Sequence, residues 1–165
     1  MIRHPLRVGR TRPGVKEFVG TRASRPVGAH PLTSRTVDRD SALAVAFGGT
    51  AGAGARWAIV ELLDGAVEDP GAWPWGVFVA NVIGCLLLGA AVTGLRRRPP
   101  SVVLGATVGF CGALTTFSAF AMDAALFLRA DEHTRLVAYI VVSFAVGAVA
   151  YLAGSGLGRR MIGTS

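Results

Sequence analysis

The chain has few residues that could build a disulfide framework or a metal centre. Only two cysteines and three histidines occur in 165 residues. Cys85 and Cys111 each lie inside an apolar run, without a cysteine or histidine at metal-ligand spacing. His4, His30 and His133 fall outside those runs. The sequence therefore predicts neither a disulfide nor a metal site made of side chains.

Nucleotide-binding and catalytic patterns are also lacking. Gly52 and Gly54 begin a G-x-G pattern, but Trp57 stands where a dinucleotide loop needs its third glycine. No βαβ pattern surrounds these residues. We therefore predict a protein that is not an enzyme and that has no catalytic residues.

Residues 1–40 lack hydrophobic periodicity and the apolar core of a signal peptide. They carry nine basic and three acidic residues, with no interleaved aromatic motif of the kind that binds nucleic acid. We predict a disordered basic tail that is attracted to anionic lipid rather than to nucleic acid.

Charge is scarce in the rest of the chain, where long apolar runs dominate. Apolar residues make up 52% of the sequence, and the mean hydropathy is +0.50. Each run has the ~20 residues that cross about 30 Å of hydrocarbon. We predict an all-α integral membrane protein whose four-helix transmembrane domain covers residues 41–158, followed by a short tail at 159–165. The expected transmembrane helices cover residues 41–63, 73–95, 101–128 and 136–157.

The basic residues between these helices are unevenly distributed. Arg96, Arg97, Arg98, Arg159 and Arg160 lie on the side of the N-terminal tail, whereas the other side has two arginines, at positions 129 and 135. The positive-inside rule then places both termini in the cytoplasm. We predict a multi-pass protein of the cell inner (plasma) membrane.

The segment 109–120, read GFCGALTTFSAF, is unusual for a helix that only spans a membrane. It holds two glycines, two threonines, a serine and three phenylalanines. This composition favours a third helix broken at mid-membrane, which is tolerated only where protein or a water-filled cavity covers it. Transport proteins place ion sites at such breaks, so we predict a channel or transporter.

Polar residues also occur at depth in the second and fourth spans. Asn81 must face protein or water, either as an interhelical hydrogen-bond partner or as a donor to an anion. A polar or small stripe in the fourth span indicates either a packing seam or a track of hydroxyl donors. Its members recur every four residues: Tyr139, Ser143, Gly147, Tyr151 and Ser155.

Two phenylalanines and one arginine complete the candidate site. Phe117 and Phe120 share a helix face directly after Thr115 and Thr116. They contact either lipid and core, or a small anion through the electropositive ring edge. Arg56 either snorkels to the interface or supplies positive potential at a vestibule.

Together these residues resemble the Fluc (CrcB) fluoride channel family over about residues 43–157. Four motifs occur in order, one in each span: GGTAGAGAR at 48–56, NVIGCLLLG at 81–89, G-x-x-T-T-F-S-x-F at 112–120, and Tyr139 with Ser143.

The resemblance implies an antiparallel, dual-topology-type dimer with two pores that passively export fluoride. It implies that Asn81 donates to fluoride and that Phe117 and Phe120 line the pore with Thr116. Tyr139 and Ser143 would form its polar track.

The resemblance also implies a structural Na⁺ at the dimer centre, held by the backbone carbonyls of Gly112 and Thr115. Carbonyl oxygens exposed at a helix break suit such a hard cation. The expected partner in the dimer is either the chain itself or an oppositely oriented homologue. The loop charges disfavour insertion of this chain in both orientations, which favours the homologue.

Three positions depart from the family pattern: Asp123 replaces Glu, Ala119 replaces Thr, and Cys85 replaces a small hydroxyl residue. Two other functions stay open. A small multidrug-type proton-coupled antiporter would need a buried carboxylate, but the first span has only Glu61, near its end. A purely structural membrane protein would explain the glycines but not the polar residues at depth.

Overall fold

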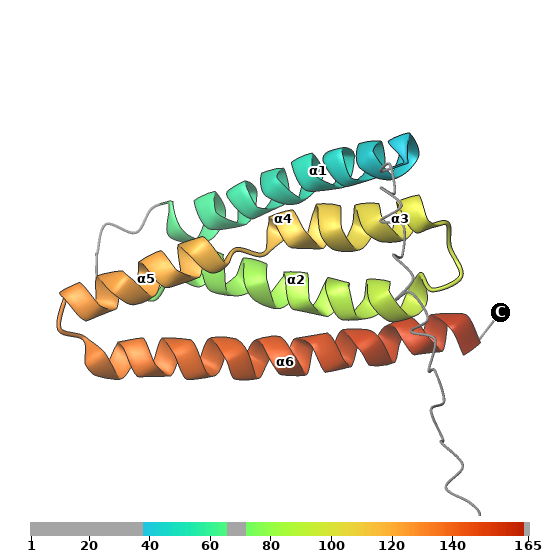
Figure 1. Ribbon diagram of the computed structural model, residues 1–165. Helices are drawn as coiled ribbons and strands as arrows, with labels where there is room; N and C mark the ends of the chain where they lie inside the picture. The colour runs from blue at the N-terminus through green and yellow to red at the C-terminus, as the bar shows by residue number, and fades with distance from the viewer. Residues whose placement is uncertain (1–37, 66–71, 164–165) are drawn as a thin grey trace, which may run out of the picture. The chain divides into compact units, whose positions relative to one another are not determined.

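The computed structural model describes residues 38–65 and 72–163, which are helical except at turns and caps. Figure 1 shows the helices α1 (Arg39–Asp64), α2 (Trp75–Gly94), α3 (Pro100–Leu104), η1 (Gly105–Cys111), α4 (Gly112–Leu114), α5 (Phe117–Arg129) and α6 (His133–Gly163). No strand occurs in these two ranges. The all-α prediction is confirmed for the described residues.

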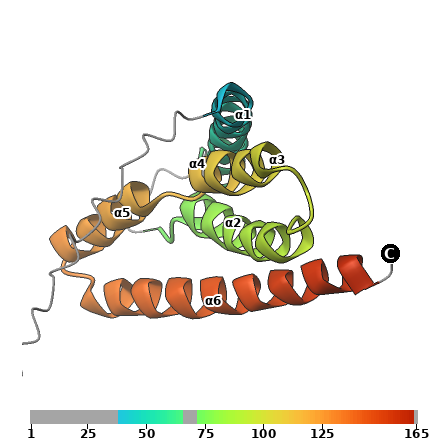
Figure 2. The same ribbon diagram turned by 45° about the vertical axis from the view of Figure 1, so that its right-hand side comes forward.

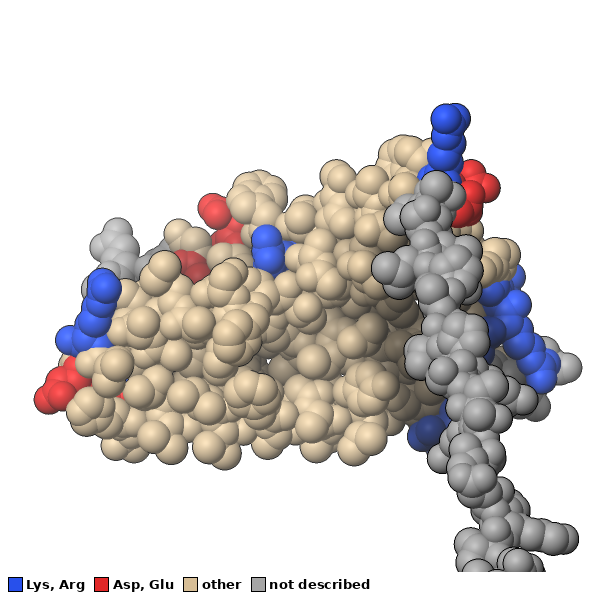
Figure 3. Space-filling view, in the orientation of Figure 1, with Lys and Arg blue, Asp and Glu red and all other residues tan. Residues whose placement is uncertain are grey.

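Four helical stretches of the described chain are long and apolar enough to cross a membrane. They are Arg39–Asp64, Trp75–Gly94, Pro100–Arg129 and His133–Met161, and the third comprises α3, η1, α4 and α5. The prediction of four membrane-spanning segments is therefore confirmed. Charged side chains gather toward the ends of these helices and leave much of the middle uncharged (Figure 3).

Both ends of the chain differ in detail from the prediction. The tail predicted for residues 1–40 lies outside the described residues, apart from its last three, and α1 already begins at Arg39. At the other end, α6 continues through Gly163 instead of ending near residue 157. Arginine and methionine favour helix, and the basic Arg160 suits the negative end of the helix dipole, so the helix extends through the predicted short tail.

The third membrane-spanning stretch is not one regular α-helix. Residues Gly105–Cys111 form a π-helical segment between α3 and α4. Thr115 (φ −81°, ψ 150°) and Thr116 (φ −146°, ψ 117°) are then extended before α5 begins at Phe117. Figure 1 shows that the helix direction changes at this point. The chain thus places two non-helical residues next to α2.

Glycines let the helices approach one another closely. A Cβ atom at Gly48 would overlap the carbonyl oxygen of Gly105, and one at Gly52 would overlap that of Phe110. The same holds for α2 and α6, where a Cβ atom at Gly89 would overlap the Tyr151 carbonyl oxygen. Figures 1 and 2 both show α2 running between α6 and the α3–α4 segment. Lipid supplies no hydrophobic force that would associate the helices, so close packing at small residues holds them together.

Two glycines two residues apart on α6 provide a matched test of this packing. A Cβ atom at Gly154 would overlap the Leu86 carbonyl oxygen, whereas nothing lies within 4 Å of the same atom at Gly156. We expect Gly154→Ala to destabilise the detergent-solubilised protein by about 1–3 kcal/mol through overpacking. Gly156→Ala should keep or raise the thermal unfolding midpoint, because alanine favours helix more than glycine does. Equal midpoints for the two variants would contradict the close contact between α2 and α6.

Candidate functional site

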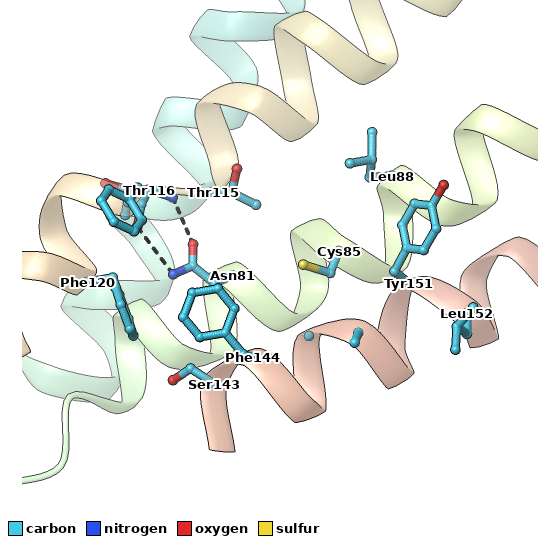
Figure 4. A pocket seen from close by; sticks show the side chains of 13 residues that line it. Asn81, Cys85, Leu88, Thr115, Thr116, Phe120, Ser143, Phe144, Tyr151 and Leu152 are labelled. Carbon is cyan, nitrogen blue, oxygen red and sulfur yellow. Dashed lines mark hydrogen bonds between the residues drawn. The ribbon is translucent and has the colours of Figure 1, made fainter. Parts of the chain in front are cut away.

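A cavity of about 640 Å³ lies beside α2 and α6, next to the extended residues of the third stretch. Figure 4 shows side chains from these elements around it. Its wall is mostly apolar, with a few hydroxyl and amide groups. The lining residues are Asn81, Cys85, Leu88, Thr115, Thr116, Phe117, Phe120, Ser143, Phe144, Gly147, Ala148, Tyr151 and Leu152.

The amide of Asn81 makes two hydrogen bonds to the backbone of Thr116 (Figure 4). Thr116 N–H donates to Asn81 Oδ1 at 2.8 Å, and Asn81 Nδ2 donates to the Thr116 carbonyl at 3.3 Å. In a continuous helix the Thr116 N–H would have bonded to the Gly112 carbonyl. Asn81 therefore satisfies the backbone groups that the interruption leaves without helical partners.

The two threonines complete this junction. Thr115 Oγ1 donates to the Cys111 carbonyl at 3.0 Å, which closes the end of α4. Thr116 Oγ1 accepts from Ala119 N–H at 3.2 Å and acts as the N-cap of α5. A Cβ atom at Gly84 would overlap Thr115 Cγ2, so this glycine lets α2 reach the junction. The two hydroxyl hydrogen bonds and the space at Gly84 thus stabilise the non-helical backbone at Thr115 and Thr116.

Phe117 and Phe120 both line the cavity but differ in exposure. Phe117 is 75% exposed, whereas Phe120 is 9% exposed. Their ring centroids lie 5.9 Å apart, and Phe120 also meets Phe144 nearly perpendicularly (83°) at 5.8 Å. The helical spacing that the sequence showed therefore brings both rings to one cavity, although only Phe120 belongs to the core.

Tyr139 lies behind this wall rather than in it. The side chain is fully buried, and its hydroxyl donates to Asp123 Oδ2 at 3.2 Å. Its ring packs against Phe120 at 4.9 Å and against Trp73 at 5.3 Å. The structure thus gives Tyr139 a position that supports Phe120, and its role as a pore residue stays a prediction.

Three members of the predicted stripe in the fourth span face the cavity: Ser143, Gly147 and Tyr151. Ser143 lines the cavity, and its buried hydroxyl has no hydrogen-bond partner among the described residues. Ser155, at the end of the stripe, is 5% exposed and packs beside Gly89 instead.

The remaining candidates lie away from the cavity wall. Arg56 is half-buried on α1 and does not line the cavity. Gly112 is exposed. No group of three His, Cys, Asp or Glu side chains in the described ranges could hold a metal ion. A Na⁺ ion held by the backbone carbonyls of Gly112 and Thr115 stays a prediction.

Sequence reasoning missed Phe144, Leu88 and Leu152 as lining residues. A bulky apolar side chain in a membrane span is ordinarily read as lipid-facing or core, so composition carries no signal for these positions. Phe144 could have been suspected only from its place beside Ser143. The π-helical segment was also missed, because π-helical turns have no strong sequence signature.

The fold and the site define a small multi-pass membrane protein with a mostly apolar cavity that carries a few polar donors. The family model for CrcB-like protein, Camphor Resistance (CrcB), matches residues 43–155. The chain belongs to this family, and it is a multi-pass protein of the cell membrane.

Curated relatives cover most of both chains. A Mycobacterium bovis protein named "Fluoride-specific ion channel FluC 1" is 37% identical over 123 residues, which are 72% of this chain and 89% of the relative. The Ignicoccus hospitalis protein "Fluoride-specific ion channel FluC" is 32% identical over 72% of this chain and 94% of the relative. The protein of the same name from Bordetella bronchiseptica is 37% identical over 73% and 89%.

The two hydrogen bonds of Asn81 give a stability prediction. Asn81→Leu keeps the number and branching of the side-chain heavy atoms but removes both hydrogen bonds to Thr116. We expect it to lower the free energy of unfolding in detergent by about 1–3 kcal/mol for each buried backbone group left unpaired. Thr50→Val is the control, since it removes only the bond from an exposed hydroxyl to Ala46 within its own helix. If Asn81→Leu unfolded at the wild-type midpoint, Asn81 would not hold the junction.

Proposed function

We propose that this chain forms a fluoride-specific ion channel that passively exports cytoplasmic fluoride and so reduces fluoride toxicity. Two facts support this proposal: membership of the CrcB family, and relatives that carry the name of a fluoride-specific channel. The observation that carries it for this chain is the cavity at the third-stretch junction, which brings Asn81, Thr116, Phe117, Phe120 and Ser143 together.

The cavity wall offers an anion polarised groups rather than a full positive charge. Ser143 Oγ has a proton to donate and no described partner. Asn81 Nδ2 carries two protons, and one bond to Thr116 leaves the second for a ligand. Phe117 and Phe120 would contribute electropositive ring edges. Weak donors of this kind let an anion enter without holding it too tightly to leave.

The driving force comes from the cell rather than from the protein. Hydrogen fluoride enters as a neutral weak acid and ionises in the more alkaline cytoplasm, which traps the anion. An inside-negative potential drives the anion outward by roughly 2.3 kcal/mol per 100 mV for each charge. A pore is therefore sufficient, and no coupled energy source is needed.

We further propose that the interruption lies at mid-membrane and that a structural Na⁺ sits beside it at a dimer centre. Thr115 and Thr116 fall midway along the Pro100–Arg129 stretch. Because Thr116 N–H bonds to Asn81, the Gly112 carbonyl has lost its usual helical donor. Gly112 also lies on an exposed surface, so its carbonyl and that of Thr115 fit the hard oxygen ligands that such a cation prefers.

An antiparallel dimer is the assembly that we propose for this channel. Large apolar side chains are exposed along α1, α5 and α6, among them Trp57, Phe117 and Phe144. Lipid can cover some of these, and a second subunit would cover others. The partner is either a second copy or an oppositely oriented homologue. Arg56, on α1, would add positive potential at a vestibule of the assembled channel.

The antiporter alternative finds no support in this arrangement. Its mechanism needs a carboxylate enclosed within the first span. Glu61 lies in the last turn of α1, where the side chain is exposed. The chain therefore lacks a buried proton-exchanging group in that helix.

Fluoride efflux from proteoliposomes tests the function and the role of the two rings together. We expect wild-type vesicles to release fluoride but retain chloride. Phe117→Ile and Phe120→Ile should each reduce fluoride efflux at least about tenfold, a barrier increase of roughly 1.4 kcal/mol, because an aliphatic side chain has no electropositive edge.

Phe47→Ile serves as the matched control, because Phe47 is exposed on α1 and does not line the cavity. Its efflux should equal that of the wild type. Wild-type efflux from both cavity variants would remove the two rings from the pore. Absence of efflux from the intact wild-type protein, both when reconstituted alone and when reconstituted with an oppositely oriented homologue, would reject the proposed function itself.

The loop charges predict one preferred orientation, with both termini in the cytoplasm. Single cysteines at Arg97 and at Asp131, introduced in a background without Cys85 and Cys111, can be labelled from outside intact cells. We expect Asp131→Cys to label and Arg97→Cys to stay protected, because five arginines on one side outweigh two on the other. Equal labelling of both positions would indicate insertion in two orientations and favour a self-paired dimer.

A further inference from the structure

Four arginines lie at one end of the helices, and the only role considered for them so far is to set the membrane orientation. Arg96, Arg97 and Arg98 occupy the turn between α2 and α3, and Arg159 lies near the end of α6. All four side chains are exposed. We refer to them as the basic patch.

A contact between two glycines brings the two parts of the patch to the same place. A Cβ atom at Gly94, the last residue of α2, would lie 3.4 Å from Gly158 Cα. One at Gly158 would lie 2.9 Å from Gly94 N. Arg96 follows Gly94 by two residues, and Arg159 directly follows Gly158. The end of α2 therefore contacts α6 next to the arginines, and Figure 1 shows these two helix ends close together.

The turn that carries three of these arginines has a defined conformation. Arg98 N–H donates to the Leu95 carbonyl at 2.9 Å, which closes the turn. Pro100 then starts α3, and the Pro99 carbonyl accepts from Val102 N–H at 3.0 Å. The three arginines are thus attached to an ordered backbone turn.

The patch lacks carboxylate partners within the described residues. Both ion pairs found there lie at the opposite end, between Asp131 and His133 and between Glu132 and Arg135. The membrane-spanning stretch of α2 ends at Gly94, directly before the patch, so we infer that the arginines lie near the level of the lipid headgroups. Exposed apolar side chains border the patch on its membrane side, with Val92 at 42% and Leu157 at 54% exposure.

We propose that the basic patch binds the headgroup of an anionic phospholipid in the leaflet that it faces. Guanidinium groups bind phosphate oxygens through paired hydrogen bonds, and basic pockets between helix ends recognise anionic headgroups. The lipid's acyl chains would lie along Val92 and Leu157. A free phosphate ion has the same headgroup chemistry, but it would leave those apolar side chains without a partner.

Lipid titration of the purified full-length protein, followed by native mass spectrometry, tests this site. The probes are phosphatidylglycerol, phosphatidylcholine and inorganic phosphate. We expect the wild type to bind phosphatidylglycerol in preference to phosphatidylcholine and to retain no inorganic phosphate. Arg159→Gln should weaken phosphatidylglycerol binding about fivefold, which corresponds to roughly 1 kcal/mol for one basic residue at an anionic surface.

Two further variants keep the test decisive. Replacing Arg96, Arg97 and Arg98 together with lysine keeps the charge that directs membrane insertion but removes the paired phosphate geometry, so binding should weaken. Arg129→Gln removes an exposed arginine at the opposite end and should bind as the wild type does. The proposal is wrong if Arg159→Gln and the lysine variant bind phosphatidylglycerol as the wild type does. It is also wrong if Arg129→Gln weakens binding equally, or if inorganic phosphate binds as well as the lipid.

Discussion

The pair of hydrogen bonds between Asn81 and the Thr116 backbone is the interaction on which the site depends. A membrane-spanning stretch that leaves helical geometry exposes backbone groups that hydrocarbon cannot solvate. Asn81 supplies one acceptor and one donor at the residue that needs both. Without these two hydrogen bonds, a continuous helix through Thr115 and Thr116 would have the lower free energy. The direction of α5, and with it the position of Phe120, follows from this junction.

Close helix packing places Asn81 where it can act. Gly84, one turn along α2, leaves room for the Thr115 side chain, and Gly89 and Gly154 bring α2 and α6 together. Glycines thus serve two purposes in this chain: they let the helices approach, and they align a short amide with an interrupted segment on another helix. The same close contact extends to Gly94 and Gly158, which determines where the basic patch forms.

The electrostatic arrangement separates charge from the cavity. The described arginines lie mainly at the helix ends, and Arg56 does not line the cavity. The cavity wall instead has hydroxyl, amide and aromatic groups. A full positive charge in such an apolar cavity would be costly to bury and would hold an anion firmly. Weak donors in an apolar wall are compatible with entry and release, which is what the proposed channel requires.

Much of this protein could be predicted from its amino-acid sequence. The apolar runs determined four membrane-spanning stretches, because their length must match the bilayer. The glycines and threonines of 109–120 indicated an irregular third stretch, since such residues are poor choices for a simple span. Four short motifs in order identified the family. These properties depend on residue type and local spacing, which a single chain displays directly.

Only the tertiary structure determined which candidate site residues contact one another. It joined Asn81 to Thr116, 35 residues away, and so gave the amide a backbone partner that the sequence had left open. It placed Ser143 at the cavity wall and Tyr139 behind Phe120, although both belong to one helical stripe. Periodicity defines the face of a helix but not the neighbour of each residue along that face. That neighbour depends on how the helices cross, and here close contacts at particular glycines determine the crossing.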